Sequence, residues 1–277
     1  MKLFLYTFST ICLFSCSPRI HTEIMGDRPP LPDSALVVVL DERDRFYRND
    51  EIGTINSFDN VLSTHCTYDE VIAKLKWMAR SHGANLIKIT MYKEADYKST
   101  CDRITAKIYK VDNVKLYEKK FGWSSDRKLA WEDYKGNPAA IHESNVAATT
   151  NCRFGIRANP LFTSGRAKVF VTNEFICHQS SVRPEQKKPS LLEHEQLHFD
   201  LCEVYARKLR KELTDAHLTP LNVDTVSKDA FLKMYKLYRE RQDLYDIETN
   251  HGLDLQAQKQ WEHKIGEELE ELSAYTN

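Results

Sequence analysis

Residues 194–198 (HEQLH) constrain this chain more than any other part of its sequence. They lie in a stretch that opens with Pro189 and a capping-box pattern, residues 190–193 (SLLE), and keeps apolar residues at helical spacing to about Thr214. Residues four apart on a helix share one face, so the imidazoles of His194 and His198 can reach one metal ion at about 2.0–2.1 Å. The sequence therefore predicts a helix that carries half of a metal site.

Glu195 follows the first histidine of this pair. At that position its carboxylate can take a proton from a water molecule at the metal instead of occupying a coordination position. This division of labour is typical of zinc hydrolases with the pattern H-E-x-x-H. We therefore expect Zn²⁺ as the cofactor, His194 and His198 as ligands, and Glu195 as the catalytic general base.

A catalytic zinc site needs a third protein ligand. On the same helix, Val204 cannot ligate, and Glu203 points about 140° away from His198. The sequence places the remaining candidates in residues 245–252 (YDIETNHG), where a second predicted helix ends.

Within that segment we expect His251 to be the third ligand, with Glu248 as the alternative and Asp246 as a less favoured one. If His251 ligates, Asp246 could orient a ligand histidine and Tyr245 could donate to the oxyanion of a tetrahedral intermediate, which would make Tyr245 catalytic. The competing interpretation places Tyr245 in the core and Asp246 on the surface of the helix.

The N-terminus has a different character. Lys2 precedes an apolar run that ends at Phe14, too short to span a bilayer and typical of a signal peptide over residues 1–15. Residues 13–16 (LFSC) resemble the lipobox of bacterial lipoproteins. This resemblance implies that Cys16 is lipidated and that the chain is an exported lipoprotein, facing the periplasm from the outer membrane; a plain secretory signal is the alternative.

Composition limits the remaining partners. The chain has 39 basic and 40 acidic residues, a net charge of −1, so nothing suggests nucleic acid as a partner. With 42% hydrophobic residues over 277 positions, the chain can bury a core of its own. We expect the lipid at Cys16 to be its attachment to a membrane.

The pattern of elements predicts an α+β protein with two domains. Residues 16–33 hold four prolines and predict an extended tether. Residues 34–115 predict a small β-α-β-β domain, with strands at 35–40, 86–92 and 104–109 and a helix at 68–81. Cys66 precedes that helix and Cys101 precedes the last strand, so export favours a disulfide between them. We expect this domain to be an accessory one, which contacts a periplasmic protein partner or acts as a spacer.

The second domain covers residues 123–277. Its sequence pattern predicts strands at 147–156 and 167–177 in a mixed or antiparallel sheet, and three C-terminal helices. Those helices are expected at 190–214, at 228–250 and after Asp254.

Four separated motifs in this domain carry a resemblance: residues 131–138 (WEDYKGNP), 147–150 (AATT), 192–200 (LEHEQLHFD), and 245–252 with Trp261. In order and spacing they resemble a family of bacterial secreted proteins described as predicted zinc-dependent proteases. The resemblance implies a zincin-like metallopeptidase fold with an H-E-x-x-H site. It also favours His251 as third ligand, and it implies a substrate that lies along an edge strand, for which we expect residues 167–177.

These features predict a zinc-dependent peptidase that acts on a peptide or protein. Two alternatives remain open. One is a non-catalytic periplasmic binding or scaffold lipoprotein that contains a metal, against which Glu195 argues. The other is an amidase of cell-wall peptides, with which the motif is equally compatible.

Overall fold

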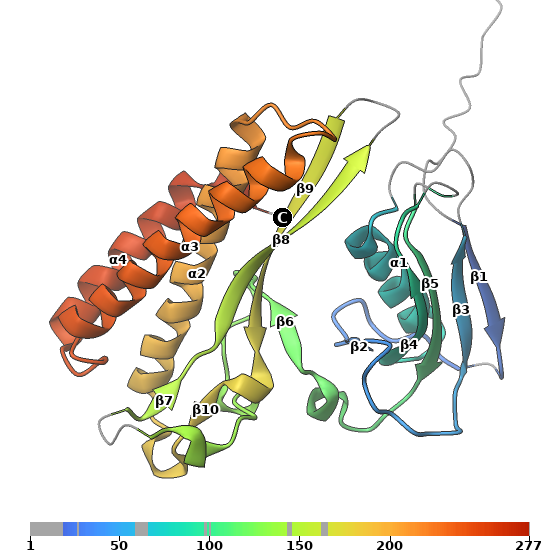
Figure 1. Cartoon of the computed structure of the whole chain (residues 1–277). Coiled ribbons are helices and arrows are strands. Elements are labelled where there is room, and N and C mark those ends of the chain that lie inside the picture. The colour runs from blue at the N-terminus through green and yellow to red at the C-terminus, as the bar shows by residue number, and fades with distance from the viewer. Residues whose placement is uncertain are drawn as a thin grey trace, which may run out of the picture. The chain divides into compact units, whose positions relative to one another are not determined.

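The computed structural model describes residues 19–26, 28–58, 66–96, 99, 101–142, 146–161 and 166–276. The chain is an α+β protein, as predicted, and it divides into two compact units, Met1–Glu118 and Lys119–Asn277 (Figure 1). The predicted signal peptide and Cys16 lie outside the described residues. In the described part of the chain, no helix combines the length and apolarity needed to cross a membrane.

The first unit is a five-stranded sheet with one helix against one face. The strands are β1 (Arg19–Ile24), β2 (Val38–Leu40), β3 (Gly53–Phe58), β4 (Leu86–Lys93) and β5 (Arg103–Tyr109), in the order β1-β3-β5-β4-β2. The helix α1 (Tyr68–Ser81) turns Val71, Leu75 and Ala79 toward the sheet, and all three are fully buried. Its bounds match the prediction.

The strand β1 corrects the expectation of an extended tether over residues 16–33. Residues 19–24 pair antiparallel with β3, and Ile20 and Ile24 pack against the core of the first unit. The alternation of Ile20, Thr22 and Ile24 is a strand pattern, and it outweighs the prolines that lie before and after it.

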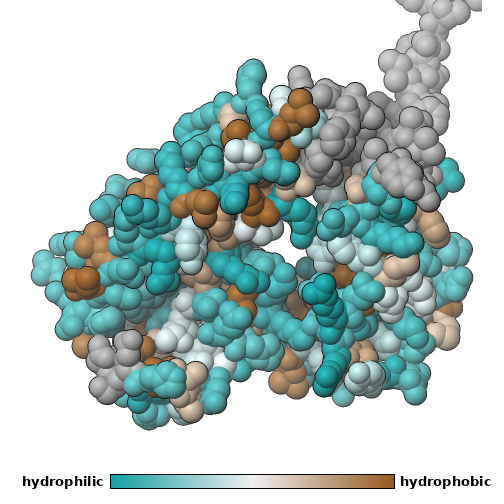
Figure 2. Space-filling view, viewed as in Figure 1, coloured by the Kyte–Doolittle hydropathy of each residue, from teal (hydrophilic) through white to brown (hydrophobic). Residues whose placement is uncertain are grey.

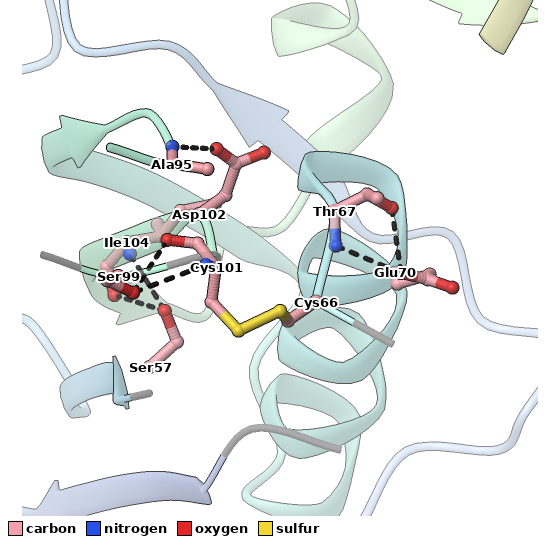
Figure 3. Close-up of a disulfide and its surroundings, with 9 residues drawn as sticks. All are labelled: Ser57, Cys66, Thr67, Glu70, Ala95, Ser99, Cys101, Asp102 and Ile104. Carbon is pink, nitrogen blue, oxygen red and sulfur yellow. Dashed lines mark hydrogen bonds between the residues drawn. A yellow bond between two sulfur atoms is a disulfide. The ribbon is translucent and has the colours of Figure 1, made fainter. Parts of the chain in front are cut away.

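A disulfide joins Cys66, just before α1, to Cys101, just before β5 (Figure 3). Both cysteines are buried. Next to this bond, Glu70 accepts hydrogen bonds from the amide and the hydroxyl of Thr67, each at 2.9 Å, which caps the first turn of α1. The bond therefore links the start of the helix to the start of a central strand.

The second unit combines a three-stranded antiparallel sheet with three long helices. Its strands are β6 (Lys120–Gly122), β7 (Ala148–Thr149), β8 (Cys152–Leu161), β9 (Arg166–Ile176) and β10 (Ser181–Val182). The sheet order is β6-β9-β8, and β7 and β10 form a separate two-stranded ladder. The helices are α2 (Pro189–Asp215), α3 (Val223–Glu248) and α4 (Leu255–Glu271). Short 3-10 helices occur at Val114–Tyr117 in the first unit and, in the second, at Trp131–Asp133, Pro138–Ala140, Cys177–Gln179, Pro184–Gln186 and Ser273–Tyr275.

The helix α2 lies at the centre of this unit. It contacts β8 and β9 on one side and α3 and α4 on the other, and its residues from Leu197 to Leu213 supply much of the core (Figure 1). It begins one residue earlier than predicted, with Pro189 in its first position and Lys188 as the residue before it, and no side chain caps it. The burial of α2 fixes which face its histidines present.

The position of β9 corrects another expectation. Residues 167–177 were expected to form an edge strand beside the site, but β9 is the central strand of its sheet. The face drawn in Figure 2 is mostly hydrophilic with isolated hydrophobic groups. Among the described residues as a whole, the exposed large apolar side chains include Leu244, Ile247 and Leu253.

Candidate metal site

Three side chains from two helices converge in the second unit. His194 and His198 come from successive turns of α2, and Asp246 comes from the last turns of α3. The Nε2 atoms of the two histidines lie 3.2 Å apart. Oδ1 of Asp246 lies 3.2 Å from Nε2 of His194 and 3.1 Å from Nε2 of His198. These ligand atoms all lie within 4.8 Å of one another, so the cluster can hold a metal ion.

The chemistry of these donors fits zinc. Two imidazole nitrogens and one carboxylate oxygen are a usual catalytic zinc set, which leaves a fourth position for water or substrate. His194 is buried, while Asp246 is about one-third exposed, so the cluster opens to solvent on the side of α3.

The electrostatics of the cluster favour a cation. Burial lowers the pKa of His198, but its hydrogen bond to Asp246 and the charges of Glu195 and Asp246 raise that pKa by more, to about 9. Burial also raises the pKa of Asp246, but the hydrogen bonds to His194 and His198 hold it well below its usual range. Without a metal, the site therefore favours a positive charge on an imidazole beside an ionised carboxylate.

Glu195 is buried, with 3% of its surface exposed, yet it lines the same cavity as the three clustered side chains. Within the described residues its carboxylate makes no hydrogen bond. A buried carboxylate without a protein partner is costly, so one that faces a cavity beside a cation site is suited to accept a proton from water there.

The cavity has a volume of about 820 Å³. The chain from Ala147 to Thr150, which includes β7, lines one part of it, and α3 and the segment that follows it, including Gln242 and His251, line another. Leu191 and Leu253 add apolar surface. The expected edge strand, β9, is not among the lining residues, so the extended chain beside the cavity is residues 147–150.

The structure does not give His251 or Glu248 the role of third ligand. Glu248 accepts a hydrogen bond from Nε1 of Trp261 at 2.9 Å. The Nδ1 atom of His251 lies 3.7 Å from Oδ1 of Asp246, outside the cluster that brings three ligands together. The helix α3 continues to Glu248, and this places Asp246 on its inner face, one turn after Gln242.

Tyr245 is not available to a substrate. It is fully buried, and its hydroxyl lies 3.1 Å from the carbonyl of His194 and 2.9 Å from Oε1 of Gln258. Its ring stacks on that of His194 with 4.7 Å between centroids, and burial raises the pKa of its phenol. The expectation that Tyr245 donates to an oxyanion is therefore wrong, and the residue supports His194.

The chain leaves α3 through a left-handed turn. Asn250 and His251 have φ values of 48° and 53°, and they are the non-glycine residues with positive φ in the described part of the chain. Gly252 follows with φ 79°, and a Cβ atom there would lie 2.9 Å from Cβ and Cγ of His194. Only glycine suits both the dihedral angle and this close approach.

The opposite side of α2 is anchored to the segment after β6. Asp200 accepts hydrogen bonds from Nε1 of Trp123 and from Nε2 of Gln196, both at 2.7 Å. The Oε1 atom of Gln196, in turn, accepts a hydrogen bond from the amide of Leu129 at 2.7 Å. The middle of the HEQLH segment therefore fixes the helix in rotation, so that His194 and His198 keep facing α3.

Two further residues were missed by the sequence analysis. Gln242 and Gln258 lie against the far nitrogens of His198 and His194. The spacing of Gln242, four residues before Asp246, could have indicated that it shares the inner face of α3. No comparable signal marks Gln258.

Comparison of the chain with protein-family models, with curated proteins and with solved structures finds no match, so the chemistry of the site is judged from its own geometry.

Proposed function

We propose that this chain is a zinc-dependent peptidase, in which His194, His198 and Asp246 hold the metal. The observation that carries this proposal is the convergence of three ligand atoms within 4.8 Å beside a buried glutamate that lines the same cavity. Zinc supplies Lewis acidity, which lowers the pKa of a water molecule and polarises a carbonyl.

Glu195 takes the role of general base. Its carboxylate accepts the proton of the attacking water and then transfers it to the nitrogen of the departing amine. It is suited to both steps because no protein hydrogen bond occupies it in the described part of the chain. Asp246 balances one charge of the cation, and its depressed pKa keeps it ionised at neutral pH.

A peptide substrate is supported by the shape of the cavity wall. One wall is the extended stretch 147–150, next to which another extended chain can lie, and the volume of about 820 Å³ leaves room for it. We also propose a zincin-like fold for the second unit, because an extended stretch of chain lines the same cavity as the two histidines of α2. An exported lipoprotein attached through Cys16, with a periplasmic partner for the first unit, remains part of this proposal.

The test measures zinc content and peptide cleavage in the same variants. The unchanged chain is expected to bind one zinc and to cleave members of a broad peptide library. His194→Ala is expected to lose both, and Glu195→Gln is expected to keep zinc and lose cleavage by at least about 100-fold. Two exposed residues supply matched controls, Glu193→Gln and His263→Ala, which are expected to change neither.

Zinc binding without cleavage of any peptide would overturn the peptidase and favour a non-catalytic metal protein. Cleavage of cell-wall peptides with no cleavage of ordinary peptides would instead favour an amidase.

A further inference from the structure

We propose that Gln242 and Gln258 are positioning residues that hold the imidazoles of His198 and His194 in the tautomer that binds metal. This inference rests on the proposed metal site and goes beyond it, because it explains what orients the ligands. It is carried by hydrogen bonds on the side of each ring that faces away from the ligand cluster.

Gln242 lies on α3 and is buried. Its Nε2 atom donates to the carbonyl of His198 at 2.9 Å, and this contact fixes the orientation of the amide. Its Oε1 atom is thereby directed at Nδ1 of His198, with which it hydrogen bonds. Because an amide oxygen only accepts, Nδ1 of His198 must carry the proton.

Gln258 does the same for His194 from α4. It is also buried, and its Oε1 atom lies 3.2 Å from Nδ1 of His194 and 2.9 Å from the hydroxyl of Tyr245. Tyr245 in turn stacks on the ring of His194, so the ring is held in its plane as well as in its tautomer. The close approach of Gly252 limits movement of His194 further.

A neutral imidazole with its proton on Nδ1 has a lone pair on Nε2. When both imidazoles are neutral, these lone pairs face Oδ1 of Asp246 at 3.2 and 3.1 Å, so three acceptor atoms converge on one point. A proton on one imidazole can occupy that point in the metal-free protein, and a metal cation would take its place. The two glutamines therefore prepare the site for a metal before it binds.

The choice of an amide over a carboxylate has a consequence for charge. Ligand histidines commonly donate their second N–H to a carboxylate, a backbone carbonyl or water. Here the two acceptors are neutral, so the negative charge at the site comes from the partly exposed Asp246 and the buried Glu195. This arrangement orients the rings without adding a third carboxylate next to the general base.

The test measures the affinity of the full chain for zinc by competition with a chelating dye, without any activity assay. Gln242→Met and Gln258→Met keep the size of the side chain and remove the strong acceptor, and each is expected to weaken zinc binding by about 10–100-fold. Gln258→Glu keeps both acceptor positions and is expected to restore most of the affinity. Gln256→Met, an exposed residue on the same helix, is the matched control and is expected to bind zinc like the unchanged chain.

Two further readouts separate positioning from a general structural role. The visible spectrum of the cobalt-substituted protein is expected to shift in the methionine variants, because the geometry of the ligands changes. The unfolding midpoint of the metal-free protein is expected to fall only slightly in the methionine variants, so that loss of folding does not account for the weaker zinc binding. Unchanged zinc affinity in both methionine variants, or an equal loss in Gln256→Met, would overturn the proposal.

The outcomes for the two proposals differ. If the unchanged chain binds zinc and cleaves no peptide while the methionine variants bind zinc more weakly, the peptidase is rejected and the positioning role stands. If the unchanged chain does not bind zinc, both are rejected.

Discussion

At the residue scale, Asp246 and His251 illustrate how five positions separate a metal ligand from a neighbour. Asp246 lies inside α3, with its carboxylate directed at both histidines of α2. His251 lies beyond the end of that helix, in a left-handed turn, with nearly half of its side chain exposed. His251 therefore lines the cavity close to Asp246, but it is not part of the metal cluster.

This distinction predicts opposite results for two substitutions. Asp246→Asn removes the charged ligand and is expected to weaken zinc binding by at least about 100-fold. His251→Ala is expected to keep one zinc per chain with little change in affinity. Isothermal titration with zinc would measure both. A loss of zinc in His251→Ala together with its retention in Asp246→Asn would return the third ligand to His251.

The residues also show what the sequence could not supply. The chelate of His194 and His198 and the position of Glu195 depend on local helical spacing, which one segment of sequence contains. The third ligand depends on which face of α3 meets α2 and on where α3 ends, and neither is a local property. A segment with two carboxylates and a histidine within six residues therefore left three candidates open.

At the scale of elements, the helices follow from local sequence, whereas the strands depend on partners that are distant in the sequence. The periodicity of apolar residues placed α1 at its observed bounds and located all three long helices of the second unit, although α3 begins five residues before its predicted start, at Val223, and no end was predicted for α4. It missed β1 and β3, because a short strand is stabilised by partners distant in the sequence. It also joined β7 and β8 into one strand, although the chain breaks between Thr149 and Cys152 to line the cavity.

The turn after α3 gives a prediction about glycine. Gly252→Ala would place a methyl group 2.9 Å from His194 at a φ of 79°, so it is expected to destabilise the fold by about 1–3 kcal/mol and to weaken zinc binding. Gly266→Ala is the control, because α4 has open space there, and it is expected to stabilise by about 0.5–1 kcal/mol. Chemical denaturation and zinc titration would measure the pair. An unaffected Gly252→Ala would show that this turn does not constrain His194.

The contact of α4 with α2 and α3 gives a prediction about pH. Glu268 on α4 lies 2.7 Å from Nζ of Lys208 on α2 and also binds Arg241 on α3. Burial raises the pKa of Glu268, but the hydrogen bonds from Arg241 and Lys208 lower it by more, so its folded pKa lies below the ordinary value of 4.5. A depressed folded pKa stabilises the protein above the unfolded value, and this stabilisation is lost as the pH falls through the folded value.

We therefore expect Glu268→Gln to lower the free energy of unfolding by about 1 kcal/mol at pH 7, after allowance for solvent screening. The difference in stability from the unchanged chain is expected to disappear as the pH falls below 4.5. Denaturation at several pH values would measure it, with the exposed Glu271→Gln as control. A difference that stays constant down to acid pH would mean that packing, rather than charge, accounts for the loss.

At the scale of the whole molecule, the two units stabilise themselves by different means. The first unit has a core of its own around α1 and also a disulfide, whereas the second has the larger core, around α2. The metal cluster and the cavity that it lines belong to the second unit alone. Stability of the first unit and zinc affinity of the second should therefore respond to separate changes.

The disulfide tests this separation. Cys66 and Cys101 are 35 positions apart, so the bond is expected to stabilise the first unit by about 3–4 kcal/mol. In Cys66→Ser/Cys101→Ser, melting is expected to show an earlier transition for the first unit, while zinc affinity and the transition that zinc raises stay as they are. Each single serine variant should behave like the double variant, because either one breaks the bond. A parallel loss of zinc affinity would mean that the folding of the first unit supports the metal site, and the catalytic chemistry would then depend on the whole chain.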